Sequence, residues 1–324
     1  MFGDYLKELR VSLGLTQSEL AVKLNLANEE FRSVDVVTLS RWERGKTKPT
    51  LAKCLRILRC LQVDLSDFYE LIPNPNETKL LDEIEQLRFN NRVTKLSSLS
   101  YEEPQEPQEP QEPQSALITE MPLLLKDDDE ILSSLKIFYE TAIHTPKGFF
   151  DINLYDYQQN KRAILKRFIT ESGQLVGHSL SFIFESDYFD KVTHSKIIDI
   201  DLTKSVSYKN STKLSVCNYN RYSSNFQIFR CMLVSQFINL IHYSNVQRYY
   251  FFNAWPESGQ ILEQLGFKKI AFDIESEKGG FKLGNRSFEH CLYEIDTATL
   301  LSQPEIITLI KTTQWDNQYS IKNH

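Results

Sequence analysis

Glycine is scarce in this chain. Only 11 of its 324 residues are glycine, whereas glycine makes up about 7% of an average protein. Glycine is the residue that lets backbone amides close tightly around a phosphate group. No Gly-x-Gly triplet occurs anywhere in the chain, so the glycine-rich loops of P-loop and dinucleotide-binding folds are excluded.

Long apolar runs and paired cysteines are missing as well. No apolar run approaches the roughly 18 residues that a membrane helix needs, and the first ten residues carry charges where a signal peptide would be apolar. We therefore expect a cytoplasmic protein that does not use a membrane. The five cysteines form no Cys-x-x-Cys pair, so neither a disulfide framework nor a metal site is indicated.

Charge of neither sign dominates. The chain has 37 Lys and Arg against 43 Asp and Glu, for a net charge of −6, so contact with nucleic acid must come from a local basic patch. Hydrophobic residues make up 41% and charged residues 25%, which is typical of a globular chain. The length predicts about two domains.

Composition divides the chain into four segments. Residues 1–72 are rich in helix formers, and 73–98 carry leucine and isoleucine at helical spacing, which predicts a helical extension. Residues 99–128 form a linker, because four Glu-Pro-Gln repeats at 103–114 fix the backbone in an extended, semi-rigid form. From residue 129 to 324, strand-like and helix-like stretches alternate, which predicts a second domain.

The first segment predicts an all-α domain. Thr16 with Glu19 makes a capping box, Asp35 is placed to cap a third helix, and Gly14 and Gly45 follow helix ends. The predicted helices are Tyr5–Leu13, one from Thr16, one from Asp35, Thr50–Leu61 and Leu65–Leu71.

Three stretches of this domain resemble the phage-repressor (Cro/C1, XRE-type) helix-turn-helix. They are Leu15–Ala21 (LTQSELA), Leu39–Gly45 (LSRWERG) and Lys48–Thr50 (KPT). One departure is the stretch Asn25–Val34, which adds about eight residues to the usually short turn before the recognition helix. The resemblance also implies that Arg10 pairs with Glu43.

The resemblance implies binding of double-stranded operator DNA, as a homodimer on a pseudo-palindromic site. Arg41 would make a two-pronged contact with guanine, and the valines would touch thymine methyl groups. Gln17 and the lysines would hold phosphates. The residues predicted to contact DNA are Gln17, Val36, Val37, Thr38, Ser40, Arg41, Arg44, Lys46 and Lys48.

The segment 129–324 predicts an α+β domain with a mixed central sheet. Runs rich in β-branched and aromatic residues predict strands over Ala163–Thr170, Val176–Phe184, Ile197–Leu202, Leu214–Tyr219, Arg248–Phe252, Lys269–Ile274 and His290–Ile295. Helical periodicity predicts helices over Glu130–Ile143, Phe226–His242 and Gln260–Leu265.

This order of elements, with Asn253 after a strand and the ending Leu262–Phe267 (LEQLGF), resembles the GCN5-related N-acetyltransferase (GNAT) fold. That family holds the pyrophosphate of coenzyme A in a glycine-rich loop. Here Arg221 matches the first position of the loop, but Ser224 replaces a glycine and Phe226 replaces a small residue.

Acyl-homoserine-lactone synthases share the fold and an arginine like Arg221, but the acid of their Glu-x-x-Arg pattern is absent here. The tyrosine acid of the acetyltransferases is missing from Ser258–Leu265 as well. We therefore assign no catalytic residue and expect no cofactor, with acyl-CoA kept as the alternative.

The favoured hypothesis is a transcription regulator whose second domain senses a small acyl compound or apolar acid, or mediates dimerisation. One alternative is an active N-acyltransferase that uses acyl-CoA or acyl-carrier protein and is targeted by its DNA-binding domain. Another is a second domain that only binds a protein partner. The residues predicted to bind the ligand are Arg221, Ser223, Ser224, Asn225, Phe226, Asn253 and Trp255.

Overall fold

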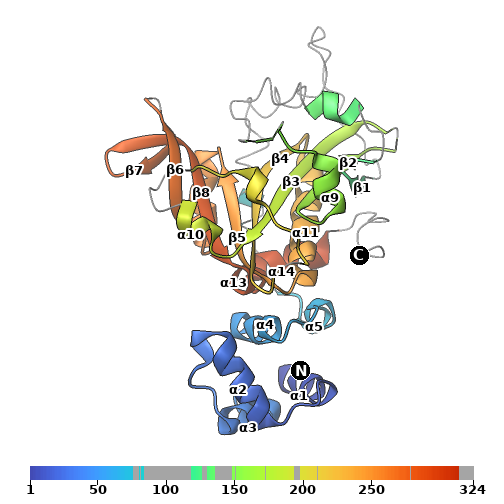
Figure 1. Ribbon diagram of the computed structural model, residues 1–324, viewed down its shortest axis with the longest axis vertical. Helices are drawn as coiled ribbons and strands as arrows, with labels where there is room; N and C mark the ends of the chain where they lie inside the picture. Colours follow the sequence, from blue (N-terminus) through green and yellow to red (C-terminus); the bar gives the residue numbers. More distant parts are fainter. Residues whose placement is uncertain are drawn as a thin grey trace.

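The computed structural model (Figure 1) describes two packed domains. The described residues are 1–75, 80, 82–83, 118–125, 130–135, 148–149, 151–171, 173–192, 198–209, 211–277 and 279–313. The Glu-Pro-Gln repeats, most of the helical extension and the end of the predicted helix Glu130–Ile143 lie outside them. Within the described part, no helix combines the length and apolarity needed to cross a membrane.

The N-terminal domain consists of helices, as predicted. Thr16 caps the second helix in a capping box, Asp35 accepts a hydrogen bond from the Thr38 amide, and Thr50 accepts one from the Lys53 amide. Side-chain caps of this kind satisfy amides that a helix start leaves unpaired. The helices are α1 (Phe2–Ser12), α2 (Gln17–Ala27), α3 (Val36–Glu43), α4 (Leu51–Cys60) and α5 (Ser66–Leu71).

The extra residues before α3 form an ordered segment that packs against the helical core. They contain a 3₁₀ turn, η1 (Glu29–Phe31), in which the Phe31 side chain is fully buried. The Asn25 amide donates to the carbonyl of Ala21 at 2.7 Å and to that of Val34 at 2.8 Å. The insertion is therefore fastened both to the core and to the start of the recognition helix.

The C-terminal domain is built on an eight-stranded sheet of order β1-β2-β3-β4-β5-β8-β6, with β7 paired to β8. Strands β4 and β5 run parallel and the other pairs are antiparallel. The strands are β1 (Thr119–Pro122), β2 (Ala163–Ile169), β3 (Leu175–Glu185), β4 (Leu214–Ser223), β5 (Val246–Asn253), β6 (Lys268–Glu275), β7 (Phe281–Leu283) and β8 (Arg286–Asp296). The predicted fold class, an all-α domain joined to an α+β domain with a mixed sheet, is confirmed.

Helices cover both faces of this sheet. The long helix α11 packs on one face beside α13 and α14, and α9 and α10 lie on the other (Figure 1). The helices and turns are α9 (Leu154–Gln159), α10 (Tyr188–Val192), η2 (Leu202–Lys204), α11 (Phe226–His242), η3 (Pro256–Ser258), α12 (Gly259–Gln264), α13 (Thr297–Leu301) and α14 (Pro304–Thr312).

Two details differ from the sequence analysis. The strand predicted over Ile197–Leu202 is wrong: its described part is irregular and ends in η2, although Ile198, Ile200 and Leu202 are all buried. Only one backbone bond, from the Ile198 amide to the Phe272 carbonyl of β6 at 3.1 Å, reaches the sheet from its described part, so the alternation there reflects burial without a strand ladder. Strand β1 pairs with β2 inside the range 99–128 assigned to the linker, so the sheet starts ahead of residue 129.

Candidate functional site

The recognition helix α3 lies on the side of the N-terminal domain farthest from the sheet (Figure 1). Val36 and Val37 are 41% and 53% exposed, while Leu39 and Trp42 are buried in the core. Thr38 and Ser40 are half-buried on the outward side. The cations Arg41, Arg44, Lys46 and Lys48 are exposed. The predicted DNA-contacting residues of α3 and the following loop are thus all at least partly accessible, and their contact with DNA stays a prediction.

A buried ion pair fastens α3 to α1. The Arg10 guanidinium donates to both carboxylate oxygens of Glu43, with Nε–Oε1 at 2.5 Å and Nη2–Oε2 at 3.0 Å, so the predicted Arg10–Glu43 pair is confirmed. The Gln17 amide also donates to Glu43, at 2.7 Å, and a phosphate contact by Gln17 stays a prediction. Burial raises the pKa of Glu43, but the bonds from Arg10 and Gln17 outweigh it and lower the pKa overall.

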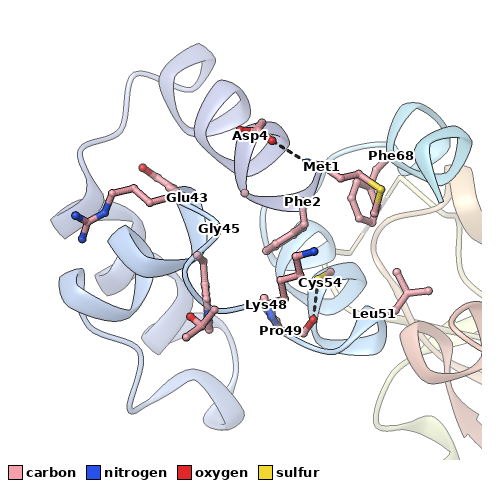
Figure 2. Close-up of a pocket in the computed structure, with 14 residues that line it drawn as sticks. Met1, Phe2, Asp4, Glu43, Gly45, Lys48, Pro49, Leu51, Cys54 and Phe68 are labelled. Atoms are coloured by element: carbon pink, nitrogen blue, oxygen red, sulfur yellow. Dashed lines mark hydrogen bonds and ion pairs between the residues drawn. The ribbon is translucent and has the colours of Figure 1, made fainter. Parts of the chain in front are cut away.

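A hollow of about 390 Å³ lies between α1 and the loop after α3 (Figure 2). Phe2, Leu51 and Phe68 give it an apolar lining, and Lys48 and Asp4 stand among its polar residues. It therefore lies beside the basic loop that is predicted to contact phosphates.

A smaller apolar cavity, of about 70 Å³, lies in the C-terminal domain between the sheet and helices α11 to α14. Its lining is mostly aliphatic and aromatic, with Arg221 and Glu305 as its charged members. The lining residues are Leu80, Arg221, Phe229, Leu233, Phe237, Tyr249, Phe251, Trp255, Ser258, Ile261, Leu262, Leu265, Phe267, Leu300, Glu305, Ile306 and Leu309. In composition, apolar with few polar groups, the lining is like that of small-molecule sites, but its volume is below their usual range of about 300–1,000 Å³.

A β-bulge aims Arg221 into this cavity. Ser181 of β3 pairs with Asn218 of β4, but Leu180 pairs with Asn220, so Tyr219 is an extra residue on β4. Side chains alternate along a strand, and one extra residue moves the next ones to the opposite face. Arg221 therefore comes to lie on the face covered by α11, directly opposite Ser179.

A chain of buried polar groups fixes the Arg221 guanidinium. Its Nη1 donates to Asn218 Oδ1 at 2.9 Å, and the Asn218 amide donates to Ser179 Oγ at 3.2 Å. Gln236 of α11 donates to the same Ser179 oxygen at 2.6 Å and accepts from the Tyr249 hydroxyl at 2.9 Å. Asn218, Ser179, Gln236 and Tyr249 are each at most 7% exposed. Burial of polar groups is costly unless they are bonded, and here each bond helps to hold one cation at the cavity wall.

The start of α11 does not fit the pyrophosphate of coenzyme A. The Ser224 amide already donates to the Val176 carbonyl at 3.0 Å, and the Asn225 side chain already caps the helix by accepting from the Ile228 amide at 2.9 Å. Phe226 stands in the first helical position. The amides and space that an anion would use there are therefore partly taken.

Side chains also fill the space where the parallel strands β4 and β5 extend beyond their last paired residues. The two parallel strands pair as far as Asn218 and Phe251, and both continue beyond that pair. On one face the Arg221 guanidinium lies 3.6 Å from the centre of the Phe251 ring, and on the other Tyr219 stacks on Phe252 at 4.9 Å. The described residues thus do not fit coenzyme A, and we assign it no part in the function.

The structure brings together part of the predicted ligand set. Arg221 and Trp255 line the cavity. Ser223 is buried on β4, Ser224 and Asn225 form the helix start, and Phe226 lies against Phe229. Asn253 bonds to Ser258 and to the Trp255 amide, so it shapes the turn that carries Trp255. Ligand binding by these residues stays a prediction.

Sequence reasoning missed the cavity walls at the C-terminal end. Leu300, Glu305, Ile306 and Leu309 come from α13 and α14, which were not predicted as helices. Their signal is present in the sequence, because Pro304 starts a stretch with apolar residues at helical spacing.

Helices α4 and α5 dock the N-terminal domain onto the helices that wall the cavity. Arg59 of α4, 7% exposed, donates to the backbone carbonyls of Tyr243 at 3.0 Å and Val246 at 2.6 Å, and also to that of Leu240. These carbonyls lie at and just after the end of α11, where the helix dipole favours a cation. Burial lowers the pKa of Arg59 to about 10, which leaves it charged near neutral pH.

Helices α13 and α14 also form hydrogen bonds with the N-terminal domain. The Tyr69 hydroxyl of α5 donates to the Leu301 carbonyl of α13 at 3.0 Å, and Lys311 of α14 donates to the Ile72 carbonyl at 2.5 Å. His242 of α11 pairs with Asp64 at 2.6 Å. One continuous apolar core runs through both domains. These contacts join α4, α5 or an adjoining loop to α11, α13 and α14, and at Val246 to the start of β5, which follows α11.

Comparisons with known proteins identify the first domain. Residues 6–68 match the sequence family described as Helix-turn-helix, so the N-terminal domain is a helix-turn-helix DNA-binding domain. No curated protein matches the chain in sequence.

Among solved structures, the chain is similar to a histone acetyltransferase HPA2 and related acetyltransferase from Corynebacterium glutamicum, with 13% identity over 55% of this chain and 95% of that chain and a TM-score of 0.30. It is also similar to a spermidine N-acetyltransferase from Vibrio cholerae, with 15% identity over 70% of this chain and 95% of that chain and a TM-score of 0.27. A third is RimJ from Mycobacterium smegmatis, with 11% identity over 50% of this chain and 67% of that chain and a TM-score of 0.28.

Proposed function

We propose that this helix-turn-helix protein is a sequence-specific transcription regulator that acts in the cytoplasm as a homodimer and responds to a small apolar acid. The acid occupies the cavity, with its tail among the aromatic and aliphatic side chains and its carboxylate on Arg221. The observation that carries the proposal is that helices α11, α13 and α14 both wall the cavity and hold α4 and α5.

The mechanism is linkage between two sites. A ligand that fits one arrangement of α11, α13 and α14 better than another shifts the position of α4 and α5 by its difference in binding free energy. Coupling factors of this kind amount to about 5- to 150-fold in affinity. The direct contact between domains means that the long linker does not have to carry the signal.

The size of the cavity limits the ligand. An engineered cavity of about 150 Å³ holds a benzene molecule, and this one is about 70 Å³. We use hexanoate as the probe, because it has a carboxylate for Arg221 and an unbranched apolar tail. Hexanoate has more heavy atoms than benzene, so it enters only if the cavity wall formed by α11, α13 and α14 moves, and this movement is what the proposed linkage requires.

The test is made on the full chain with an operator selected from a random duplex pool. Hexanoate is expected to change operator affinity about 5-fold or more in the wild type. Arg221→Ala should abolish this response, while Arg286→Ala, which removes an exposed arginine paired with Glu275, should keep it. An unchanged response in Arg221→Ala would refute the assigned site. Turnover of acyl-CoA by the wild type that is lost in Arg221→Ala would establish the enzyme in place of the sensor.

DNA recognition is tested at two exposed cations. Arg41→Ala should relax the preference at one base pair and cost about 1–3 kcal/mol, because it removes a contact to a base edge. Lys48→Ala should weaken binding to all sequences alike and reduce the salt slope by about 1. Equal effects of both variants on every sequence would show that α3 is not the helix that reads the bases.

A further inference from the structure

Arg56 of α4 links the insertion before the recognition helix to the C-terminal domain, because it binds Glu30 on one side and Asp296 on the other. Resting on the proposed function, we infer that Glu30, Arg56 and Asp296 form the contact by which the C-terminal domain positions the recognition helix. Glu30 belongs to the insertion, Arg56 to α4 and Asp296 to the end of β8. The three residues thus span both domains.

On the side of the C-terminal domain, the contact reaches the cavity wall. Asp296 caps α13: its Oδ1 accepts from the Thr299 amide at 2.8 Å and also from Arg56 Nη2 at 2.8 Å. Arg56 donates to the Thr299 hydroxyl at 3.2 Å too. Leu300, the next residue of α13, lines the cavity. A shift of α13 therefore moves the acceptors that hold Arg56.

On the side of the N-terminal domain, the other end of the same guanidinium binds the Glu30 carboxylate. Phe31, next to Glu30, is fully buried, and Val34 is 6% exposed. Asp35 then caps α3 through the Thr38 amide at 2.7 Å. Phe31 and Asn25 hold the insertion to the core and to the residues just before α3. A displacement of Glu30 is therefore expected to move the start of the recognition helix.

The contact of Arg56 with Glu30 and Asp296 differs from an ordinary ion pair at the protein surface. Arg56 is only 20% exposed and bridges two acids from different domains with different nitrogens. The same insertion offers a matched contrast, because Arg32 pairs with Glu29 at exposures of 71% and 82% and both partners lie within it. Exposed pairs of that kind contribute about 0–1 kcal/mol.

A double-substitution cycle on the full chain tests the inference. Glu30→Gln and Asp296→Asn each remove a charge and keep the shape, and asparagine still caps a helix. We expect each to weaken operator binding about 3- to 10-fold, and the double variant to be no weaker than the stronger single one. Arg32→Gln is expected to stay within about twofold of the wild type.

Hydrogen exchange separates a positioning role from loss of the fold. The amides of Thr38–Ser40 should exchange faster in Glu30→Gln and in Asp296→Asn, while those of α1 keep wild-type protection. Additive losses of affinity, or losses equal to that of Arg32→Gln, would overturn the inference. Failure of the proposed function is distinguishable, because hexanoate would then leave the wild type unchanged whatever the cycle gives.

Discussion

At the scale of single residues, the molecule shows how partners decide the state of a buried ionisable group. Glu43 is buried with Arg10 and Gln17 and its pKa is lowered, whereas His178 is fully buried beside Asn220 and its pKa falls to about 4. The first stays charged because it is bonded, and the second stays neutral because burial disfavours its charged form.

Glu43→Ala should destabilise the N-terminal domain by about 3–5 kcal/mol, because it leaves the Arg10 guanidinium largely buried with no carboxylate. Urea unfolding measures the loss. Glu29→Ala removes an acid that is 82% exposed and should cost no more than about 1 kcal/mol. Similar losses in the two variants would contradict the role given to the Glu43 pair.

His178 should make stability depend on pH. Its pKa is lowered in the folded chain to about 4 from 6.5, so between these values the unfolded state binds the proton and is favoured. Stability from this residue is present above about pH 6.5 and is lost as the pH falls towards 4, by about 3 kcal/mol in total. In urea unfolding, His178→Asn should flatten this part of the profile, and an unchanged slope would refute the assignment.

At the scale of elements, Gly177 of β3 occupies a position where close packing leaves no room for a side chain. A Cβ on Gly177 of β3 would lie 2.8 Å from the Ile228 side chain and 3.0 Å from the Tyr222 carbonyl. Strand β3 therefore sits too close to α11 and β4 for any larger residue.

Gly177→Ala should cost about 1–3 kcal/mol through overpacking, as measured by thermal or urea unfolding of the full chain. Ser181→Ala serves as the control, because it changes the same face of β3 without adding atoms. It removes only the acceptor of one Asn218 hydrogen bond at 3.0 Å. A stability equal to the wild type in Gly177→Ala would show that the strand can move away from α11.

Elements with strong local signals were predictable from the sequence. Helix α11 matches its predicted bounds, Phe226–His242, because apolar periodicity and a capping residue agree there. The bulge at Tyr219 was not predictable, because it depends on how β3 and β4 pair, and alternation alone places Arg221 on the wrong face. The DNA-contacting set follows from the motif, whereas the cavity walls on α13 and α14 needed the tertiary structure.

At the scale of the whole molecule, the docked domains behave as one packed body. The apolar core that includes Leu58 and Phe68 also includes Leu240 and Leu300. Arg59 is buried in this contact with carbonyl partners, and no partner bonds its Nε among the described residues. Because removing a charge from water is costly, a buried arginine of this kind limits the net stability of docking.

We expect calorimetry of the wild type to give a single unfolding transition that includes both domains. Arg59→Met keeps the apolar stem but removes the donors to Leu240, Tyr243 and Val246, so the N-terminal helices should unfold separately and earlier. Arg286→Met, which removes an exposed pair with Glu275, should keep the single transition. Two transitions in the wild type would contradict the shared core.

The position of α4 and α5 also decides where this protein can be recombined with others. The linker is the obvious place to join two proteins. However, the residues of the N-terminal domain that bind the C-terminal domain lie before the linker, between Arg56 and Ile72. A chimera cut at the linker would present a foreign surface to α11, α13 and α14. A chimera that exchanges α1 to α3 but keeps Glu30, α4 and α5 would retain both that surface and the Glu30–Arg56 contact, so new DNA specificity is best grafted within the first domain.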